Sequence, residues 1–154
     1  MAFPLTVHLG YGQEKVETSS QKQKLGTRAV TPDGRVFYYA ENSGTAITSA
    51  GQLVDGIAQV GANDGDLATA ALAAGSLTVT TTTSLTVTKD QYKDGYLFIN
   101  DNAAQGEVYR IKSNTAVSSA AGLEVTVDEP DGIRTAFTTS TQLGLMYNPY
   151  KDIK

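Results

Sequence analysis

The chain has 154 residues, which is enough for one domain of ordinary size, and it contains no cysteine. Disulfides, zinc fingers, iron–sulfur clusters and thiol nucleophiles are therefore excluded. The formal net charge of −4 argues against nucleic acid as a partner, because phosphate binding depends on clustered Lys and Arg.

The amino terminus has no basic leader followed by a long apolar run. No window approaches the roughly 20 consecutive apolar residues of a membrane helix. We therefore expect neither a secretory signal nor a membrane partner, and synthesis in a cytoplasm.

Residues 1–25 are predicted to form an extended N-terminal arm, followed by a single β-rich domain over residues 26–154. The stretch 12–24, GQEKVETSSQKQK, has one apolar side chain, Val16, so its burial cannot offset the entropy cost of ordering it. We expect it to be mobile alone and ordered only against another surface. Residues 1–36 also carry five basic side chains against three acidic ones, the basic ones being Lys15, Lys22, Lys24, Arg28 and Arg35.

The motif TPDGR, residues 31–35, predicts a tight turn. Pro32 presets φ for the first central position, and Gly34 supplies a positive φ. The four β-forming residues 36–39, VFYY, follow directly. Four such residues in a row predict a strand that is buried on both faces.

In the stretch 76–88, SLTVTTTTSLTVT, every even position is Ser or Thr, whereas the odd positions are Leu77, Val79, Thr81, Thr83, Leu85 and Val87. This period of two predicts β-strand with one apolar and one hydroxyl-bearing face. One strand of this length would span about 40 Å at ~3.3 Å per residue, which is long for a domain of this size. We therefore expect a turn or bulge within residues 80–84.

One short helix is predicted over residues 66–75, DLATAALAAG. Asp64 or Asp66 can cap its amino terminus, the alanines favour helix, and Gly75 can end it. Four further β-rich stretches follow, at 95–100, 106–113, 122–129 and 142–148. Their spacing of roughly 10 to 15 residues predicts an all-β sandwich or jelly-roll/barrel-like domain.

The sequence offers little chemistry for catalysis. His8 is the only histidine, which leaves no partner for a two-histidine metal site. The loop at 61–66, GANDGD, lacks the ligand spacing of a calcium-binding EF-hand and is read as a turn. The segment 127–132, VDEPDG, is interpreted as an acidic loop at the end of a strand. Its carboxylates are not taken as catalytic, because acid–base catalysis on a sugar needs two carboxylates at a defined separation across a cleft. We expect no catalytic residue, metal site or cofactor.

The aromatic side chains lie mostly in or beside predicted strands. They could form a stacking platform for a sugar or for single-stranded nucleic acid. Binding of nucleic acid would also need basic residues interleaved with the aromatic ones, and these are lacking. Packing in a core or between subunits accounts for them better, because Tyr can bury its ring while its hydroxyl finds a partner.

The order of several segments resembles the head decoration proteins of tailed bacteriophages, also called capsid-stabilising or cement proteins. The resemblance covers residues 25–153 and includes LGTRAVTPDGRVFYYAEN, AGQLVDG, LAAGSLTVTTTTSLTVTKDQYKDGYLFINDNAAQGEVYRIKSN, LEVTVDEP and LMYNPYKDI. It implies a β-rich, non-enzymatic virion structural protein that binds the major capsid protein on the outer capsid surface. It also implies assembly as a homotrimer.

Two groups of candidate residues follow from charge, apolarity and position. The residues expected to contact the capsid are Phe3, Leu5, Lys15, Lys22, Lys24 and Arg28. The residues expected to form the oligomer interface are Phe37, Tyr38, Tyr39, Tyr147 and Tyr150. Two alternatives stay open: another virion component, associated with the tail or a fibre, and a carbohydrate-binding module whose exposed tyrosines contact a glycan.

Overall fold

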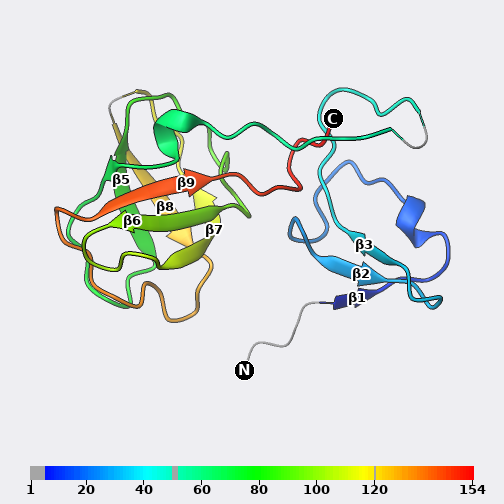
Figure 1. Ribbon diagram of the computed structural model, residues 1–154, viewed down its shortest axis with the longest axis horizontal. Helices are drawn as coiled ribbons and strands as arrows, with labels where there is room; N and C mark the ends of the chain where they lie inside the picture. The colour runs from blue at the N-terminus through cyan, green and yellow to red at the C-terminus, as the bar shows by residue number, and fades with distance from the viewer. Residues whose placement is uncertain (1–5, 50–51, 120) are drawn as a thin grey trace. The chain divides into compact units, whose positions relative to one another are not determined.

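A computed structural model describes residues 6–49, 52–119 and 121–154. The chain divides into two compact units, one made of residues 1–57 with 149–154 and the other of residues 58–148. Both units are built from β-strands (Figure 1), so the expected mainly-β, sandwich or barrel-like fold class is confirmed. The domain boundary predicted after residue 25 falls inside the first unit.

The second unit is a six-stranded antiparallel sheet that nearly closes on itself. Its strands are β4 (Leu67–Ala68), β5 (Thr78–Thr83), β6 (Tyr96–Asp101), β7 (Val108–Asn114), β8 (Ala121–Val127) and β9 (Gln142–Met146), in the order β4-β9-β6-β7-β8-β5. The two end strands meet, since Thr69 forms a bridge with Thr81 and the Ala70 N–H donates to the Thr80 carbonyl at 3.1 Å. Closure removes the exposed edges that an open sheet would leave.

The alternation predicted in the Thr-rich stretch is present in β5. Val79, Thr81 and Thr83 are buried, while the residues between them are exposed or half-buried. The strand ends at Thr83 and the chain bends at residues 84–85, so the predicted interruption lies at the end of the expected window. Beyond the bend, Val87 contributes a single bridge to Val117.

Hydrogen bonds explain how threonines can occupy the inward face of β5. The Thr83 hydroxyl donates to Asn63 Oδ1 at 2.7 Å, and Asn63 Nδ2 donates to the Tyr92 hydroxyl at 2.8 Å. Tyr92 stacks on Tyr147, with ring centroids 4.7 Å apart. Burial raises the pKa of Tyr92 to about 12, against a smaller lowering effect of the Asn63 hydrogen bond. A buried polar network of this kind is stable because its groups are paired.

The prediction of a helix over residues 66–75 is wrong. Asp66 has a left-handed φ of 58°, and the chain then enters β4, which pairs antiparallel with β9. Leu67 and Thr69 are buried while Ala68 and Ala70 are exposed, which is the period of a strand. A helix of two or three turns is marginal in water, so pairing that closes the barrel outweighs the alanine propensity.

The first unit contains a three-stranded sheet, β1 (Thr6–His8), β2 (Arg28–Val30) and β3 (Val36–Tyr38), in that order. β1 runs parallel to β2, and β2 runs antiparallel to β3 across the predicted Pro-Asp-Gly turn. Parallel neighbours need a connection of a dozen residues or more. The polar stretch 12–24, predicted to be part of a free arm, lies in this connection and includes a short 3₁₀ turn, η1 (Gln13–Lys15). A second 3₁₀ turn, η2 (Gly61–Asn63), lies in the second unit.

The first unit is completed by residues 149–154, which return to it after the barrel. The Glu41 N–H donates to the Tyr150 carbonyl and the Ser43 N–H to the Ile153 carbonyl, both at 2.9 Å. On the other side, Asp55 and Lys154 exchange two backbone hydrogen bonds, each 2.9 Å long. The segment therefore lies between two stretches of residues 41–57, bonded to both.

Candidate assembly surface

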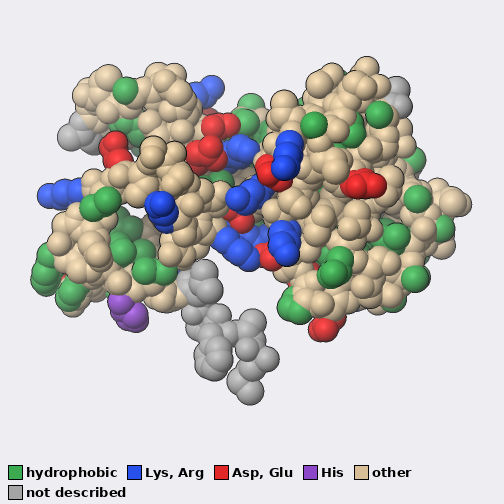
Figure 2. Space-filling model, turned by 180° about the vertical axis from the view of Figure 1, so that it is seen from behind, with side chains coloured by type: hydrophobic (Ala, Val, Ile, Leu, Met, Phe, Trp, Pro, Cys, Tyr) green, Lys and Arg blue, Asp and Glu red, His purple; other side chains and the backbone are tan. Residues whose placement is uncertain are grey.

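The two units differ sharply in how much apolar surface they bury. Of the buried hydrophobic side chains in the described residues, only Leu25 and Ala29 belong to the first unit. The described part of the first unit instead exposes seven large hydrophobic side chains, Tyr11, Val16, Val36, Tyr38, Ile47, Leu53 and Val54. Hydrophobic side chains reach the surface at several separate points of this unit, seen on the left of Figure 2. Burial within this small unit contributes little to its stability.

The aromatic residues of β3 are more exposed than predicted. Tyr38 is 49% exposed and Phe37 and Tyr39 are half-buried, so the expected burial on both faces is wrong for this chain alone. A sheet of three short strands offers too little area to cover both of its faces. Tyr38 stacks on Tyr150, with ring centroids 5.2 Å apart and planes inclined by 20°. The predicted interface residues Tyr38 and Tyr150 are therefore brought together by the returning C-terminal segment.

Tyr147 lies apart from this group, in the core of the second unit. It is 4% exposed, stacks on Tyr92, and its hydroxyl accepts a hydrogen bond from Gln91 Nε2 at 2.6 Å. A side chain this buried offers almost no surface to another subunit, so we leave Tyr147 out of the candidate surface. The alternation along β9 indicates this burial, because Tyr147 lies two residues after Leu145 and four after Leu143 and so faces the same side of the strand.

Tyr39 holds the polar connection against β3. Its hydroxyl accepts a hydrogen bond from the Lys22 N–H at 2.9 Å, and its backbone exchanges hydrogen bonds with Gly26 and Thr27 at 2.8 and 3.0 Å. The polar stretch is thus ordered by a few hydrogen bonds instead of apolar burial, which is a weak form of attachment.

Replacing Tyr39 with Phe is expected to release this attachment while keeping the ring. The Lys22 amide loses its acceptor, at a cost of about 1 kcal/mol to local stability. Hydrogen exchange measured by NMR should show faster exchange at Lys22, with unchanged exchange in β7 as the internal reference. Equal protection at Lys22 in both proteins would contradict this account.

The predicted capsid-contact cations are exposed on the first unit. Lys15 lies in η1, Lys22 and Lys24 in the connection that follows, and Arg28 opens β2. Phe3 and Leu5 lie outside the described residues.

Arg35, a further cation of the first unit, has two acidic neighbours. It forms ion pairs with Asp33 at 2.7 Å and with Glu14 at 3.7 Å. The hydrogen bonds from Thr31 and Arg35 hold the pKa of Asp33 below its ordinary value, and Asp33 raises the pKa of Arg35. The Arg35 guanidinium is therefore already engaged by acidic groups of its own unit.

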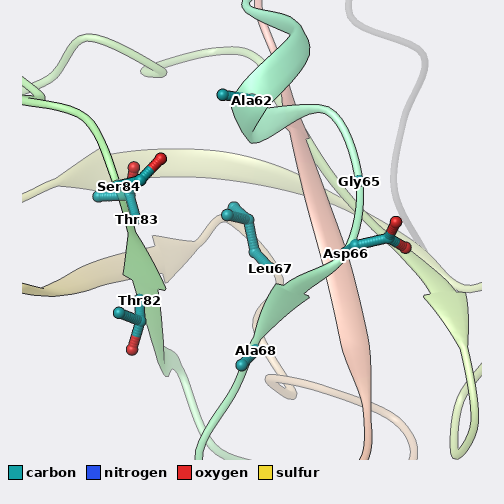
Figure 3. Close-up of a pocket in the computed structure, with 8 residues that line it drawn as sticks. All are labelled: Ala62, Gly65, Asp66, Leu67, Ala68, Thr82, Thr83 and Ser84. Atoms are coloured by element: carbon teal, nitrogen blue, oxygen red, sulfur yellow. The ribbon is translucent and has the colours of Figure 1, made fainter. Parts of the chain in front are cut away.

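The second unit has an open pocket of about 480 Å³ beside β4 and β5 (Figure 3). Its lining consists of Ala62, Gly65, Asp66, Leu67, Ala68, Thr82, Thr83 and Ser84. Its one carboxylate, on Asp66, accepts a hydrogen bond from Asn100 Nδ2 at 2.7 Å. The pocket has neither the pair of carboxylates used in glycoside hydrolysis nor an aromatic ring on which a sugar could stack.

The acidic stretch after β8 leads into a polar cluster around Glu107. The Thr135 hydroxyl donates to Glu107 at 2.7 Å, the Tyr109 hydroxyl also donates to this carboxylate, and the Arg134 N–H donates to the Tyr109 hydroxyl at 2.9 Å. Desolvation raises the pKa of Glu107, but the two hydrogen bonds and the nearby Arg134 charge outweigh it and leave the pKa below its ordinary value. The cluster ties the loop after β8 to the barrel.

This cluster predicts a pH dependence of stability. A carboxylate whose folded-state pKa is lowered stabilises the fold above its ordinary pKa of about 4.3, and this contribution is lost as the pH falls through the folded-state value. In urea denaturation, Glu107→Gln should therefore be less stable than the parent at pH 7, and the difference should shrink towards pH 3. A difference independent of pH would exclude this role of the carboxylate.

Among residues 6–49, 52–119 and 121–154, no group of three or more His, Asp or Glu side chains is arranged to hold a metal ion. Within the same ranges, no helix has the length and apolarity that crossing a membrane requires. His8 is exposed in β1.

Comparison with known proteins adds no relative to these observations. No protein-family model matches the chain, and no curated protein and no solved structure matches it.

Proposed function

We propose that this protein is a non-enzymatic decoration protein of a tailed-bacteriophage head, bound as a trimer to the major capsid protein on the outer surface of the virion. The resemblance of its segments to that family motivates the proposal. The observation that carries it is the first unit, which buries two hydrophobic side chains and exposes seven large ones among the described residues.

A unit with so little internal burial is suited to being stabilised by partners. Burial of apolar surface contributes roughly 25 cal/mol per Å², and a unit of about 60 residues buries only about 60% of the surface that its unfolded chain exposes, which leaves its stability marginal. The chain has no cysteine. Association with other copies and with the shell would supply the missing burial, whereas the barrel is already complete.

The net charge also differs between the two units. The second unit has ten acidic and five basic residues, a formal net charge of −5, whereas the first has six acidic and seven basic residues, a net charge of +1. An acidic barrel facing solvent favours solubility and avoids DNA. The exposed cations of the first unit, Lys15, Lys22, Lys24 and Arg28, would then face an acidic shell.

Binding to stripped heads of the virus that carries this chain tests the proposal. The variant K22E/K24E should lose most of its occupancy on expanded shells at physiological salt, because two attractive contacts become repulsive. The matched control K89E/K93E makes the same change in charge on exposed lysines of the second unit and should retain occupancy. Equal loss in both variants would point to a general charge effect and contradict a capsid-facing first unit.

Cryo-electron microscopy of the virion tests the assigned place directly. Density for this protein at the threefold sites of the head supports the proposal, whereas density confined to the tail or a fibre overturns it. Retention of the purified protein on a glycan array, together with no binding to stripped heads, would replace it with a carbohydrate-binding role.

A further inference from the structure

Among the residues that the structure describes, the sheet of the first unit is open at both edges, in contrast to the nearly closed sheet of the second unit. In the order β1-β2-β3, no further strand within the described residues pairs with the outer side of β1 or of β3. Open edges are templates for strand pairing, and proteins commonly close or cover them. This chain does so in the second unit, through the Thr69–Thr81 bridge, whereas the described part of the first unit has no bridge to the outer side of β1 or β3.

The hydrogen-bond pattern identifies the backbone groups that point outward. On β3, the Arg35 carbonyl and the Tyr39 N–H bond inward, so by the alternation of antiparallel pairs Val36 and Tyr38 direct theirs outward. On β1, the Leu9 N–H bonds inward to Val30, so Thr6 and His8 direct theirs outward. Each edge thus offers two outward-facing residues on a strand of three.

We propose that the outer edge of β3 in one copy pairs with the outer edge of β1 in the next copy, so that the three-stranded sheets join head to tail into a closed ring. In the proposed trimer this ring would hold nine strands. The inference deepens the self-assembly part of the proposed function and is independent of the capsid, since it concerns contacts between copies alone.

Strand direction favours this pairing. β1 is parallel to β2 and β2 is antiparallel to β3, so β1 and β3 run in opposite directions. Rotation about an axis along the strands preserves direction, and β3 of one copy therefore meets β1 of the next in antiparallel orientation. Such a head-to-tail interface closes into a ring when the rotation closes. The half-exposed side chains of Val36 and Tyr38, at 42% and 49%, would be covered by the neighbour.

Engineered cysteines give a direct test because the chain has none of its own. Val7, Ala29 and Phe37 form one row across the sheet, which continues to Val7 of the next copy. Within one chain the ends of this row lie two strand spacings apart, about 10 Å, beyond the roughly 7 Å that a disulfide can bridge. A disulfide between V7C and F37C can therefore form only between copies.

The double variant V7C/F37C should oxidise to a covalent ring that migrates as a trimer on a non-reducing gel, whereas the single variants V7C and F37C should remain monomeric there. The double variant L9C/F37C tests the alternative pairing in which β1 of the next copy is shifted by two residues relative to β3. Efficient dimers of F37C alone would show that like edges pair, and would overturn the head-to-tail arrangement. The absence of a cross-link in both double variants would overturn it as well.

Light scattering of the full chain supplies an independent measure. Val36→Pro removes the outward N–H of β3 and leaves the inner ladder intact, so the trimer should dissociate, while the control Val36→Thr keeps the N–H and should remain trimeric. A monomeric parent protein in solution would overturn the ring. Loss of capsid binding in a protein that still forms the ring would instead refute the proposed function alone.

Discussion

Deleting residues 150–154 is expected to unfold the first unit while the second unit stays folded. The segment accepts or donates six backbone hydrogen bonds to residues 41–43 and 55–57. Each contributes about 1 kcal/mol net, so several kcal/mol are lost from a unit whose described residues include only two buried hydrophobic side chains. The barrel has its own core of buried side chains and does not include this segment.

Hydrogen exchange followed by mass spectrometry distinguishes the two units. In the truncated chain, peptides covering residues 28–43 should lose protection, and peptides of β6 and β7 should keep it. The control Tyr150→Ala removes the stack on Tyr38 but retains the backbone ladder, so it should weaken protection only partly. Full protection of the first unit after truncation would show that the returning segment is dispensable.

Gly95→Ala is expected to destabilise the barrel by about 3 kcal/mol. A Cβ at this position, immediately before β6, would lie 2.2 Å from the Met146 carbonyl oxygen and 2.9 Å from that of Tyr92. Both contacts are backbone atoms. The Met146 carbonyl belongs to the paired strand β9, and the Tyr92 carbonyl accepts a hydrogen bond from the Gly95 N–H at 2.9 Å, so moving either one disturbs backbone hydrogen bonding. The strand pair β6–β9 must separate to admit one methyl group.

Urea denaturation monitored by the near-UV signal of the stacked Tyr92–Tyr147 pair measures this loss. Gly61→Ala is the matched control, because a Cβ there meets no atom within 4 Å. It should leave the midpoint nearly unchanged. Equal stability of Gly95→Ala and the parent would mean that β6 and β9 can separate at little cost.

Alternation of apolar and polar residues, with a period of two, predicted most strands of the second unit. The alternation in β5 and the β-rich stretches that became β6 to β9 are local, since one face of each strand is buried by its neighbours. The short helix failed because strand pairing with β9, far along the chain, outweighed a local preference for helix. Sequence patterns carry no information about such distant partners.

The candidate surface was predicted only in part. Charge indicated which cations are exposed, and the aromatic run located β3. The pairing of Tyr38 with Tyr150 could not be predicted, because it depends on a segment that returns after the barrel. The prediction that Tyr147 lies in the oligomer interface rested on apolarity and position, whereas the structure places its ring in a buried stack with Tyr92.

The first unit is discontinuous in the sequence, and this fixes the order in which its parts are synthesised. The barrel's residues 58–148 lie between the two parts of that unit, so the ribosome must make them before residues 149–154 exist. At 5 to 20 residues per second this delay lasts roughly 5 to 20 seconds. A nascent chain therefore displays a foldable barrel first, and the unit with the open edges is completed later. The strands with the open edges are synthesised first, but the first unit is expected to unfold without residues 150–154, so these edges should form, and association between nascent chains should begin, only once the chain is complete.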